Sequence, residues 1–233
     1  MASTQPKSFG LLLFEGFEIL DAAGPIDCLN VLAMFMEKDM KVSVLAKSLD
    51  PVTPGPGDKS KPGSAFNGQQ LYKPTHTFDQ APQLDVLIVP GGRGTRADLK
   101  HEVEFIKKVH DGYDGKPPAK FLFSVCTGSV LFAQAGILDH VRATSNKRSW
   151  NWVTEQGKKT HWVAKARWVE DGRIWTCSGV SAGIDGMIAW IAHVHGEQTA
   201  EEVCNIIEHT RVKESDDDPF ADLNGCHDVS PTP

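Results

Sequence analysis

Residues 120–136 read KFLFSVCTGSVLFAQAG, and this stretch decides the fold. Residues 120–125 form a nearly continuous apolar run, which is typical of a strand buried on both faces of a sheet. Residues 127–135 have the character of a helix, and Gly136 is a typical residue for its C-terminal end. Cys126 stands between the two segments, so the stretch predicts a strand, a sharp turn and a helix.

The same alternation of strands and helices runs along most of the chain. Further buried strands are predicted at 9–14, 41–46 and 85–89, and further helices at 26–35, 102–110, 182–194 and 199–209, with Pro25 at a first helical position. Alternating stretches around Asp171-Gly172 predict a β-hairpin near 162–176. This order predicts an α/β fold with a mostly parallel central sheet and helices on both faces.

The whole chain, residues 1–233, is predicted to form one domain, which is an ordinary size for an α/β unit. Residues 48–64 are rich in proline and glycine, and the alternation continues after them, so they are predicted to be a loop insertion. Residues 215–233 are acidic and rich in Pro, Gly and Asp, and are predicted to form a C-terminal tail packed weakly on the surface.

Charge and cysteine content narrow the class of protein. The net charge of −6 does not fit a basic nucleic-acid-binding surface, and the apolar run at 9–14 is too short to span a membrane. The five cysteines are scattered and form no CxxC pair, which indicates neither a disulfide framework nor a zinc ribbon. These features predict a reduced, cytoplasmic protein that binds neither nucleic acid nor membrane.

The turn at Cys126 has the pattern of a nucleophile elbow. Ser124 and Gly128 flank the cysteine at two residues' distance, and only small side chains fit at these places in such a sharp turn. The helix that follows points its N-terminus at the sulfur, which favours the reactive thiolate. The alternative is a buried structural cysteine, which is the interpretation we favour for Cys28, Cys177, Cys204 and Cys226.

Two further predicted strand ends carry candidate site residues. Gly91 and Gly92 follow the strand at 85–89, and with the amide of Thr127 they could bind an anion or oxyanion, although an ordinary turn explains the same glycines. Asp21 ends an apolar run beside a helix start, where it either caps the helix or holds a carboxyl group near the thiol to transfer a proton. The carboxyl ends of parallel strands share one edge of a sheet, so these groups are predicted to meet there.

The sequence offers little for a metal site or a cluster of cations. His193 and His195 are two residues apart on a predicted helix and therefore point in different directions, and His161 and His209 are isolated. We expect surface or packing roles for these histidines and no metal. Three cations could bind anions but are more simply solvated charges: Arg142, Lys147 and Arg148.

These motifs together resemble the ThiJ/PfpI superfamily (class I glutamine amidotransferase-like) from about Phe9 to His209, and within it the isonitrile (isocyanide) hydratases. The matching blocks are Leu20-Asp21-Ala22-Ala23-Gly24-Pro25-Ile26-Asp27, Val89-Pro90-Gly91-Gly92, Ser124-Val125-Cys126-Thr127-Gly128-Ser129, Ala135-Gly136-Ile137-Leu138, Arg142-Ala143-Thr144 and Ser181-Ala182-Gly183-Ile184-Asp185. The resemblance implies a flavodoxin-like sandwich and a homodimer. It also implies that Cys126 is the nucleophile, that Asp21 is the acid and base, and that Gly92 and Thr127 place their amides near the reacting atom.

Two positions separate this chain from other branches of the superfamily. Thr127 follows the cysteine, where the protease-like and glyoxalase-like branches typically have a histidine or use a separate catalytic histidine. Asn146 stands near the place where bacterial hydratases have a histidine after the Ala-Thr pair, so the pocket differs from theirs.

The resemblance favours cysteine-dependent hydration of an isocyanide to an N-substituted formamide through a covalent thioimidate, with a small-molecule substrate and no cofactor. Two alternatives stay open. The same thiol could act on 2-oxoaldehydes, as in glyoxalases and deglycases, although the adjacent histidine is missing. The chain could instead be a non-catalytic redox-sensing or regulatory protein, because an elbow cysteine with a low pKa is readily oxidised.

Overall fold

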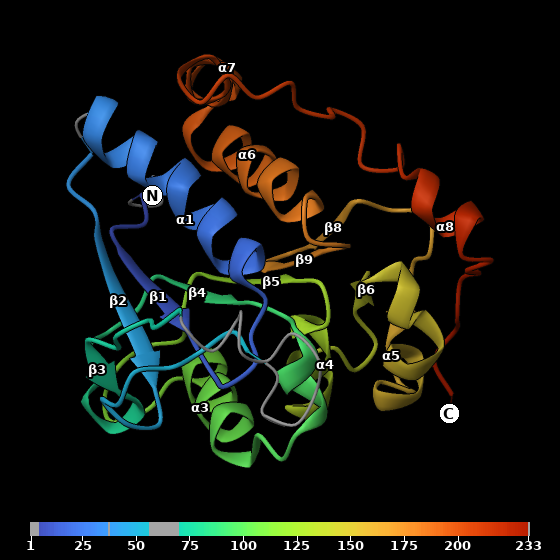
Figure 1. Cartoon of the computed structure of the whole chain (residues 1–233), viewed down its shortest axis with the longest axis horizontal. Helices are drawn as coiled ribbons and strands as arrows, with labels where there is room; N and C mark the ends of the chain where they lie inside the picture. Colours follow the sequence, from blue (N-terminus) through green and yellow to red (C-terminus); the bar gives the residue numbers. More distant parts are fainter. Residues whose placement is uncertain (1–4, 37, 56–69, 233) are drawn as a thin grey trace.

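A seven-stranded sheet forms the centre of the computed structural model, which describes residues 5–36, 38–55 and 70–232 (Figure 1). The strands lie in the order β3-β2-β1-β4-β5-β9-β8, and every neighbouring pair is parallel except β8 with β9. The strands of this sheet are β1 (Ser8–Leu12), β2 (Lys41–Ala46), β3 (His76–Thr77), β4 (Val86–Val89), β5 (Phe121–Val125), β8 (Trp168–Asp171) and β9 (Ile174–Cys177). The strands β6 (Arg142–Ala143) and β7 (His161–Trp162) form a separate two-stranded sheet. The mostly parallel sheet confirms the predicted fold class.

Helices cover both faces of this sheet, as the flavodoxin-like α/β sandwich requires. The helices are α1 (Ile19–Phe35), α3 (Lys100–Asp111), α4 (Gly128–Gln134), α5 (Trp150–Gln156), α6 (Ala182–His195), α7 (Glu197–Ile206) and α8 (Pro219–Leu223). Figure 1 shows α1, α6 and α7 on one face and α3 and α4 on the other. The central strands β4 and β5 are almost wholly buried, which explains their continuous apolar sequences.

The predicted hairpin exists but is shorter than the stretch 162–176. Its strands are β8 and β9, paired antiparallel from Trp168 with Cys177 to Asp171 with Ile174, and Gly172 in the turn has a φ of +58°. The residues at the start of the predicted stretch belong instead to β7, which pairs with β6 in a separate two-stranded parallel sheet. The prediction of a hairpin is confirmed around Gly172, but the antiparallel strands do not extend back to Trp162.

Helix α1 begins six residues earlier than the sequence predicts. Pro25 lies inside the helix rather than at its first position, and the helix starts at Ile19. The early turn contains Asp21, whose side chain accepts a hydrogen bond from the backbone N–H of Gly91 at 2.9 Å. Because a distant loop holds this turn, tertiary contact outweighs the local preference of proline for a helix start.

The C-terminal segment packs more firmly than the weakly held tail that its composition predicts. Trp162 and Val229 exchange two backbone hydrogen bonds of 2.9 and 3.0 Å, and the backbone N–H of Arg167 donates to the carbonyl of Ser215 at 2.6 Å. Asp218 is only 1% exposed. The prediction of weak packing was wrong because buried side chains of this segment meet partners from the domain.

Part of the predicted insertion lies outside the described residues. Residues 48–55 are described, and there Val52 pairs with Tyr72 while the carbonyl of Thr53 accepts a hydrogen bond from the N–H of Gly16 at 2.9 Å. Residues 56–64 of the insertion lie outside the described residues. Across the described ranges, no helix combines the length and apolar character that crossing a membrane requires.

Candidate active site

The turn between β5 and α4 holds Cys126 in a strained backbone conformation. Its φ is +57°, in the left-handed region that residues other than glycine seldom adopt. A side chain on Gly128 would place its Cβ 2.4 Å from the carbonyl oxygen of Val89, so only glycine fits there. The geometry is that of the predicted elbow, and strain of this kind tends to mark functional positions.

Hydrogen bonds on both sides of the peptide hold this conformation. The backbone N–H of Cys126 donates to the carbonyl of Cys177 on the neighbouring strand at 3.0 Å. Its carbonyl accepts from the hydroxyls of Ser145 at 2.8 Å and Ser129 at 3.2 Å. The Ser129 hydroxyl also contacts that of Ser145 at 2.9 Å, so a buried pair of hydroxyls holds the Cys126 carbonyl.

Asp21 lies against the Cys126 thiol from the first turn of α1. Its side chain is completely buried, its Oδ2 accepts from the backbone N–H of Gly91, and its carboxyl group interacts with the thiol. Its other oxygen, Oδ1, has no hydrogen-bond partner among the described residues. The carboxyl group therefore serves a distant loop and the thiol rather than capping its own helix.

Burial sets the protonation of this pair. It raises the pKa of Asp21 to about 8, with the nearby charge of Glu18 adding to the effect and the bonds from Gly91 and Cys126 opposing it. Burial and the charge of Asp21 also raise the pKa of the Cys126 thiol above its ordinary value. The N–H and hydroxyl of Thr127 lower it, as the helix N-terminus predicts, but burial outweighs them. The resting pair near neutral pH is therefore an acid beside a thiol.

The two glycines let the loop after β4 approach the elbow closely. A Cβ on Gly91 would lie 2.5 Å from the nitrogen of Thr127 and 2.9 Å from the Cβ of Cys126. The N–H of Gly92 donates to the Thr127 hydroxyl at 3.0 Å, and Thr95 donates to the same hydroxyl at 3.0 Å. The amides of Gly91 and Gly92 thus have acceptors within the protein, and their binding of an oxyanion stays a prediction.

The structure therefore brings together the predicted residues Asp21, Gly91, Cys126 and Thr127, with Gly92 at the Thr127 hydroxyl. Sequence reasoning did not single out the hydroxyls of Thr95, Ser129 and Ser145. Ser129 belongs to one of the quoted blocks, but no spacing in the sequence shows which backbone group its hydroxyl binds.

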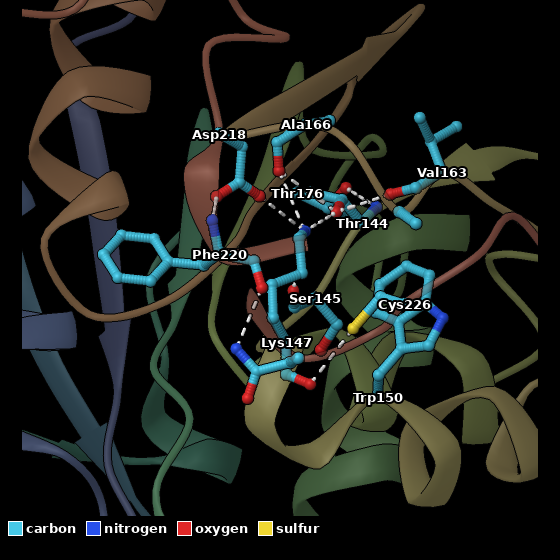
Figure 2. A network of polar contacts seen from close by, with 12 residues as sticks. Thr144, Ser145, Lys147, Trp150, Val163, Ala166, Thr176, Asp218, Phe220 and Cys226 are labelled. Carbon is cyan, nitrogen blue, oxygen red and sulfur yellow. Dashed lines mark hydrogen bonds and ion pairs between the residues drawn. The ribbon is translucent and has the colours of Figure 1, made fainter. Parts of the chain in front are cut away.

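Lys147 is buried, which contradicts its prediction as a solvated charge. Figure 2 shows its Nζ among oxygen atoms: it donates to the hydroxyl of Thr144 at 2.7 Å and to the carbonyls of Ala166 and Ser145 at 2.9 and 3.1 Å. Asp218 Oδ2 lies 3.3 Å away as its anionic partner. Burial lowers the pKa of Lys147 to about 8, although Asp218 opposes this. Sequence neighbours cannot reveal such a partner 71 residues away.

Asn146 lines a cavity of about 430 Å³ close to the elbow. Its Oδ1 accepts a hydrogen bond from the N–H of Ser149, and its Nδ2 lies next to Gly179, which also lines the cavity. The position that the sequence singled out as different from the bacterial hydratases therefore lies at a cavity. As for metals, no group of three or more His, Cys, Asp or Glu in the described part of the chain is placed to hold an ion.

A strained elbow cysteine at the carboxyl edge of a parallel sheet, with a buried acid against its thiol, defines a cysteine-centred α/β sandwich. The sequence model of the DJ-1/PfpI family matches residues 7–193, and the chain belongs to this family.

Individual relatives carry different functions. The isonitrile hydratase of Pseudomonas putida is 34% identical over 196 residues, which cover 83% of this chain and 75% of the hydratase. The HTH-type transcriptional regulator GbdR of Pseudomonas aeruginosa is 24% identical over 91% of this chain, which spans 53% of the regulator. A crystal structure of a ThiJ/PfpI family protein from Pseudomonas syringae superposes with a TM-score of 0.71 at 29% identity, covering 88% of this chain and 76% of that one.

Proposed function

We propose that the protein hydrates isocyanides to N-substituted formamides, with Cys126 as nucleophile and Asp21 as acid and base. The observation that carries this proposal is the buried Asp21 carboxyl group against the thiol, with one oxygen that no described residue binds. The similarity to isonitrile hydratase over most of the chain supports the same reaction.

The terminal carbon of an isocyanide accepts both a nucleophile and a proton, which a thiol beside an acid can supply together. The sulfur of Cys126 bonds to this carbon while Asp21 gives it a proton and receives the proton of the thiol. The product is a thioimidate, R–N=CH–S–Cys126. A carboxyl group whose pKa is about 8 holds the required proton near neutral pH.

Water then attacks the same carbon, with Asp21 accepting its proton and passing one to the nitrogen. The hydroxyl proton of the resulting adduct returns to sulfur as the C–S bond breaks, which releases R–NH–CHO and restores the thiol. One water is consumed, no electrons are gained or lost, and these steps use no metal or organic cofactor. Covalent catalysis divides one difficult hydration into two easier steps.

The test is formamide production from an alkyl and an aryl isocyanide, followed by NMR. We expect Cys126→Ala to show no rate above the uncatalysed reaction, and Asp21→Asn to lose about 10²–10⁴-fold in kcat. Cys204→Ala is the matched control, because this cysteine is also buried but lies in α7, and it should retain activity.

The absence of formamide from the wild-type protein with every isocyanide would contradict the proposal. Lactate from methylglyoxal would then favour action on 2-oxoaldehydes. Turnover of neither substrate would favour a regulatory protein, a second candidate supported by the similarity to GbdR over 91% of the chain.

We also propose that the protein is a cytoplasmic homodimer with a small-molecule substrate and without nucleic-acid or membrane partners. Helix α1 supports association because Leu20, Met34 and Phe35 are exposed at 41%, 73% and 60%. Light scattering on the purified protein measures its mass directly.

A further inference from the structure

The cavity beside the elbow has a wall that comes from the C-terminal segment. Its volume of about 430 Å³ lies in the range of small-molecule sites, roughly 300–1,000 Å³. It is lined by residues of five segments: Leu20; Asn146, Lys147 and Arg148; Arg167; residues 178–182; and Asp218, Phe220, Leu223 and Asn224. The last group belongs to α8 and its two ends.

The lining residues are direct chain neighbours of groups that hold the nucleophile. Ser178 follows the residue whose carbonyl accepts the N–H of Cys126, and Asn146 follows the serine whose hydroxyl binds its carbonyl. Leu20 precedes Asp21. Three lining residues are therefore one position away from residues that contact Cys126, although Cys126 itself, 6% exposed, is not one of the described lining residues.

A buried anchor fixes the position of α8 at this cavity. Asp218 caps the helix by accepting from the N–H of Phe220 at 3.0 Å through Oδ1, while its Oδ2 pairs with Lys147. Figure 2 shows the Phe220 ring pointing away from Lys147, on the opposite side of Asp218. With the helix held in this way, Ala221 is buried in the core, and Phe220 and Leu223 line the cavity.

Two of the three cations in the lining are paired within the protein, the third, Arg148, is exposed, and several apolar side chains share the lining. Lys147 is paired with Asp218, and the guanidinium of Arg167 donates to Asp185 through Nε at 3.1 Å. Leu20, Val180, Ala182, Phe220 and Leu223 supply hydrocarbon surface. Phe220 and Leu223 are 46% and 77% exposed, so an apolar group in the cavity would remove their surface from water.

We infer that this cavity binds the hydrocarbon substituent of the isocyanide and that α8 selects its size. The inference rests on the proposed hydration. An isocyano group is linear and only two atoms long, so it is narrow enough to reach a thiol with little exposure. A bulky alkyl or aryl substituent then occupies the cavity. Helix α8 lies beyond residues 7–193, the part that the family model matches, so this wall is additional to the family's common framework.

The experiment compares methyl isocyanide with cyclohexyl isocyanide in steady-state kinetics. In Phe220→Ala, KM for the cyclohexyl substrate should rise about tenfold with kcat unchanged, because the contact stabilises bound substrate and transition state alike. In Val180→Trp, a filled cavity should reduce kcat/KM for the cyclohexyl substrate at least tenfold. Both variants should keep kcat/KM for methyl isocyanide within about twofold. Leu49→Ala, at a residue that is 48% exposed and does not line the cavity, is the matched control and should leave both substrates unaffected.

Equal losses for the two substrates would overturn the inference, because α8 would then act on the whole fold rather than on the substituent. The outcome for the proposed function is separate. If the wild type hydrates no isocyanide, binding of N-cyclohexylformamide to Cys126→Ala is measured by calorimetry. Weaker binding after adding Phe220→Ala supports the apolar cavity while rejecting the reaction, and unchanged or undetectable binding overturns the cavity as well.

Discussion

Asp21 and Asp218 are the two least exposed carboxyl residues in the described part of the chain, at 0% and 1%, and their surroundings differ. Asp218 Oδ1 accepts a hydrogen bond from the N–H of Phe220, and its Oδ2 lies 3.3 Å from the ammonium group of Lys147, an ion pair without hydrogen-bond geometry. Asp21 has one backbone N–H and a thiol as neighbours, and among the described residues no cation pairs with it. One carboxyl group is neutralised by a partner, and the other is neutralised by keeping its proton.

The difference separates an anchor from a reactive group. A buried charge is tolerated when a counter-charge and hydrogen bonds replace water, and the result is a fixed contact with little remaining capacity to react. A buried carboxyl group without a cation has a raised pKa and a proton available for transfer near neutral pH. The same amino acid therefore holds the C-terminal segment at one site and serves the thiol at the other.

The substitution Asp218→Asn should break the anchor and have the larger effect on stability. It removes the ion-pair partner of the buried Lys147 ammonium group, and breaking a buried ion pair costs about 3–5 kcal/mol. Urea unfolding at pH 7 measures the loss. Asp222→Asn in the same helix is the control, because its contact with Lys165 is exposed and contributes about 0–1 kcal/mol. Equal stabilities for the two variants would show that Asp218 is not an anchor.

The equivalent change at the other carboxyl group, Asp21→Asn, should raise the free energy of unfolding at pH 7 rather than lower it. The folded protein retains the Asp21 proton up to about pH 8, whereas the unfolded chain releases it near pH 4, so the free energy of unfolding falls as pH rises between these values. An amide does not ionise, and it should therefore stabilise the protein at pH 7 by roughly 2–4 kcal/mol.

This gain should disappear below about pH 4, where both states of the wild-type protein carry the proton. Unfolding curves of both proteins at pH 4 and pH 7 test it. A variant that is less stable than the wild type at pH 7 would mean that Asp21 is ionised in the folded protein.

The smallest expected effect on stability is that of Ser145, which contacts both Cys126 and Lys147. Ser145 binds the Cys126 carbonyl through its hydroxyl and Lys147 through its own carbonyl. In Ser145→Ala the hydroxyl of Ser129 still binds the Cys126 carbonyl, so the loss of stability should be about 1 kcal/mol. Thr154→Ala, which removes an exposed hydroxyl, should change stability by less than about 0.5 kcal/mol. A loss above 3 kcal/mol would show that the two hydroxyls depend on each other.

The elbow and the positions of the buried strands could be predicted because their signals are local, whereas the order of the strands in the sheet was not predicted. Small residues around Cys126 and apolar runs before the turns follow from backbone geometry within a few residues. The meeting of Asp21 with Gly91 was foreseen only as a shared sheet edge, and the structure places Asp21 in a helix rather than at a strand end. The rule about strand ends still indicated the correct edge.

The anchor and the cavity wall could not be predicted, because neither leaves a local trace. The five-residue helix α8 is too short for periodicity to reveal, and an acidic, proline-containing segment has the composition of a loose tail. The buried state of Lys147 depends on carbonyls and a carboxylate from three separate segments. A single charged residue in a sequence carries no information on such an assembly.

The position of α8 has a consequence for anyone who shortens this protein. A gene fragment cut at the end of the family match, after residue 193, would still encode Asp21 and Cys126. It would lack Asp218, the strand-like contact of Val229 with Trp162 and one wall of the cavity. Expression trials and mutant libraries should therefore extend through residue 229, because boundaries drawn from family similarity would remove one partner of the Lys147–Asp218 ion pair and of the Trp162–Val229 backbone hydrogen bonds.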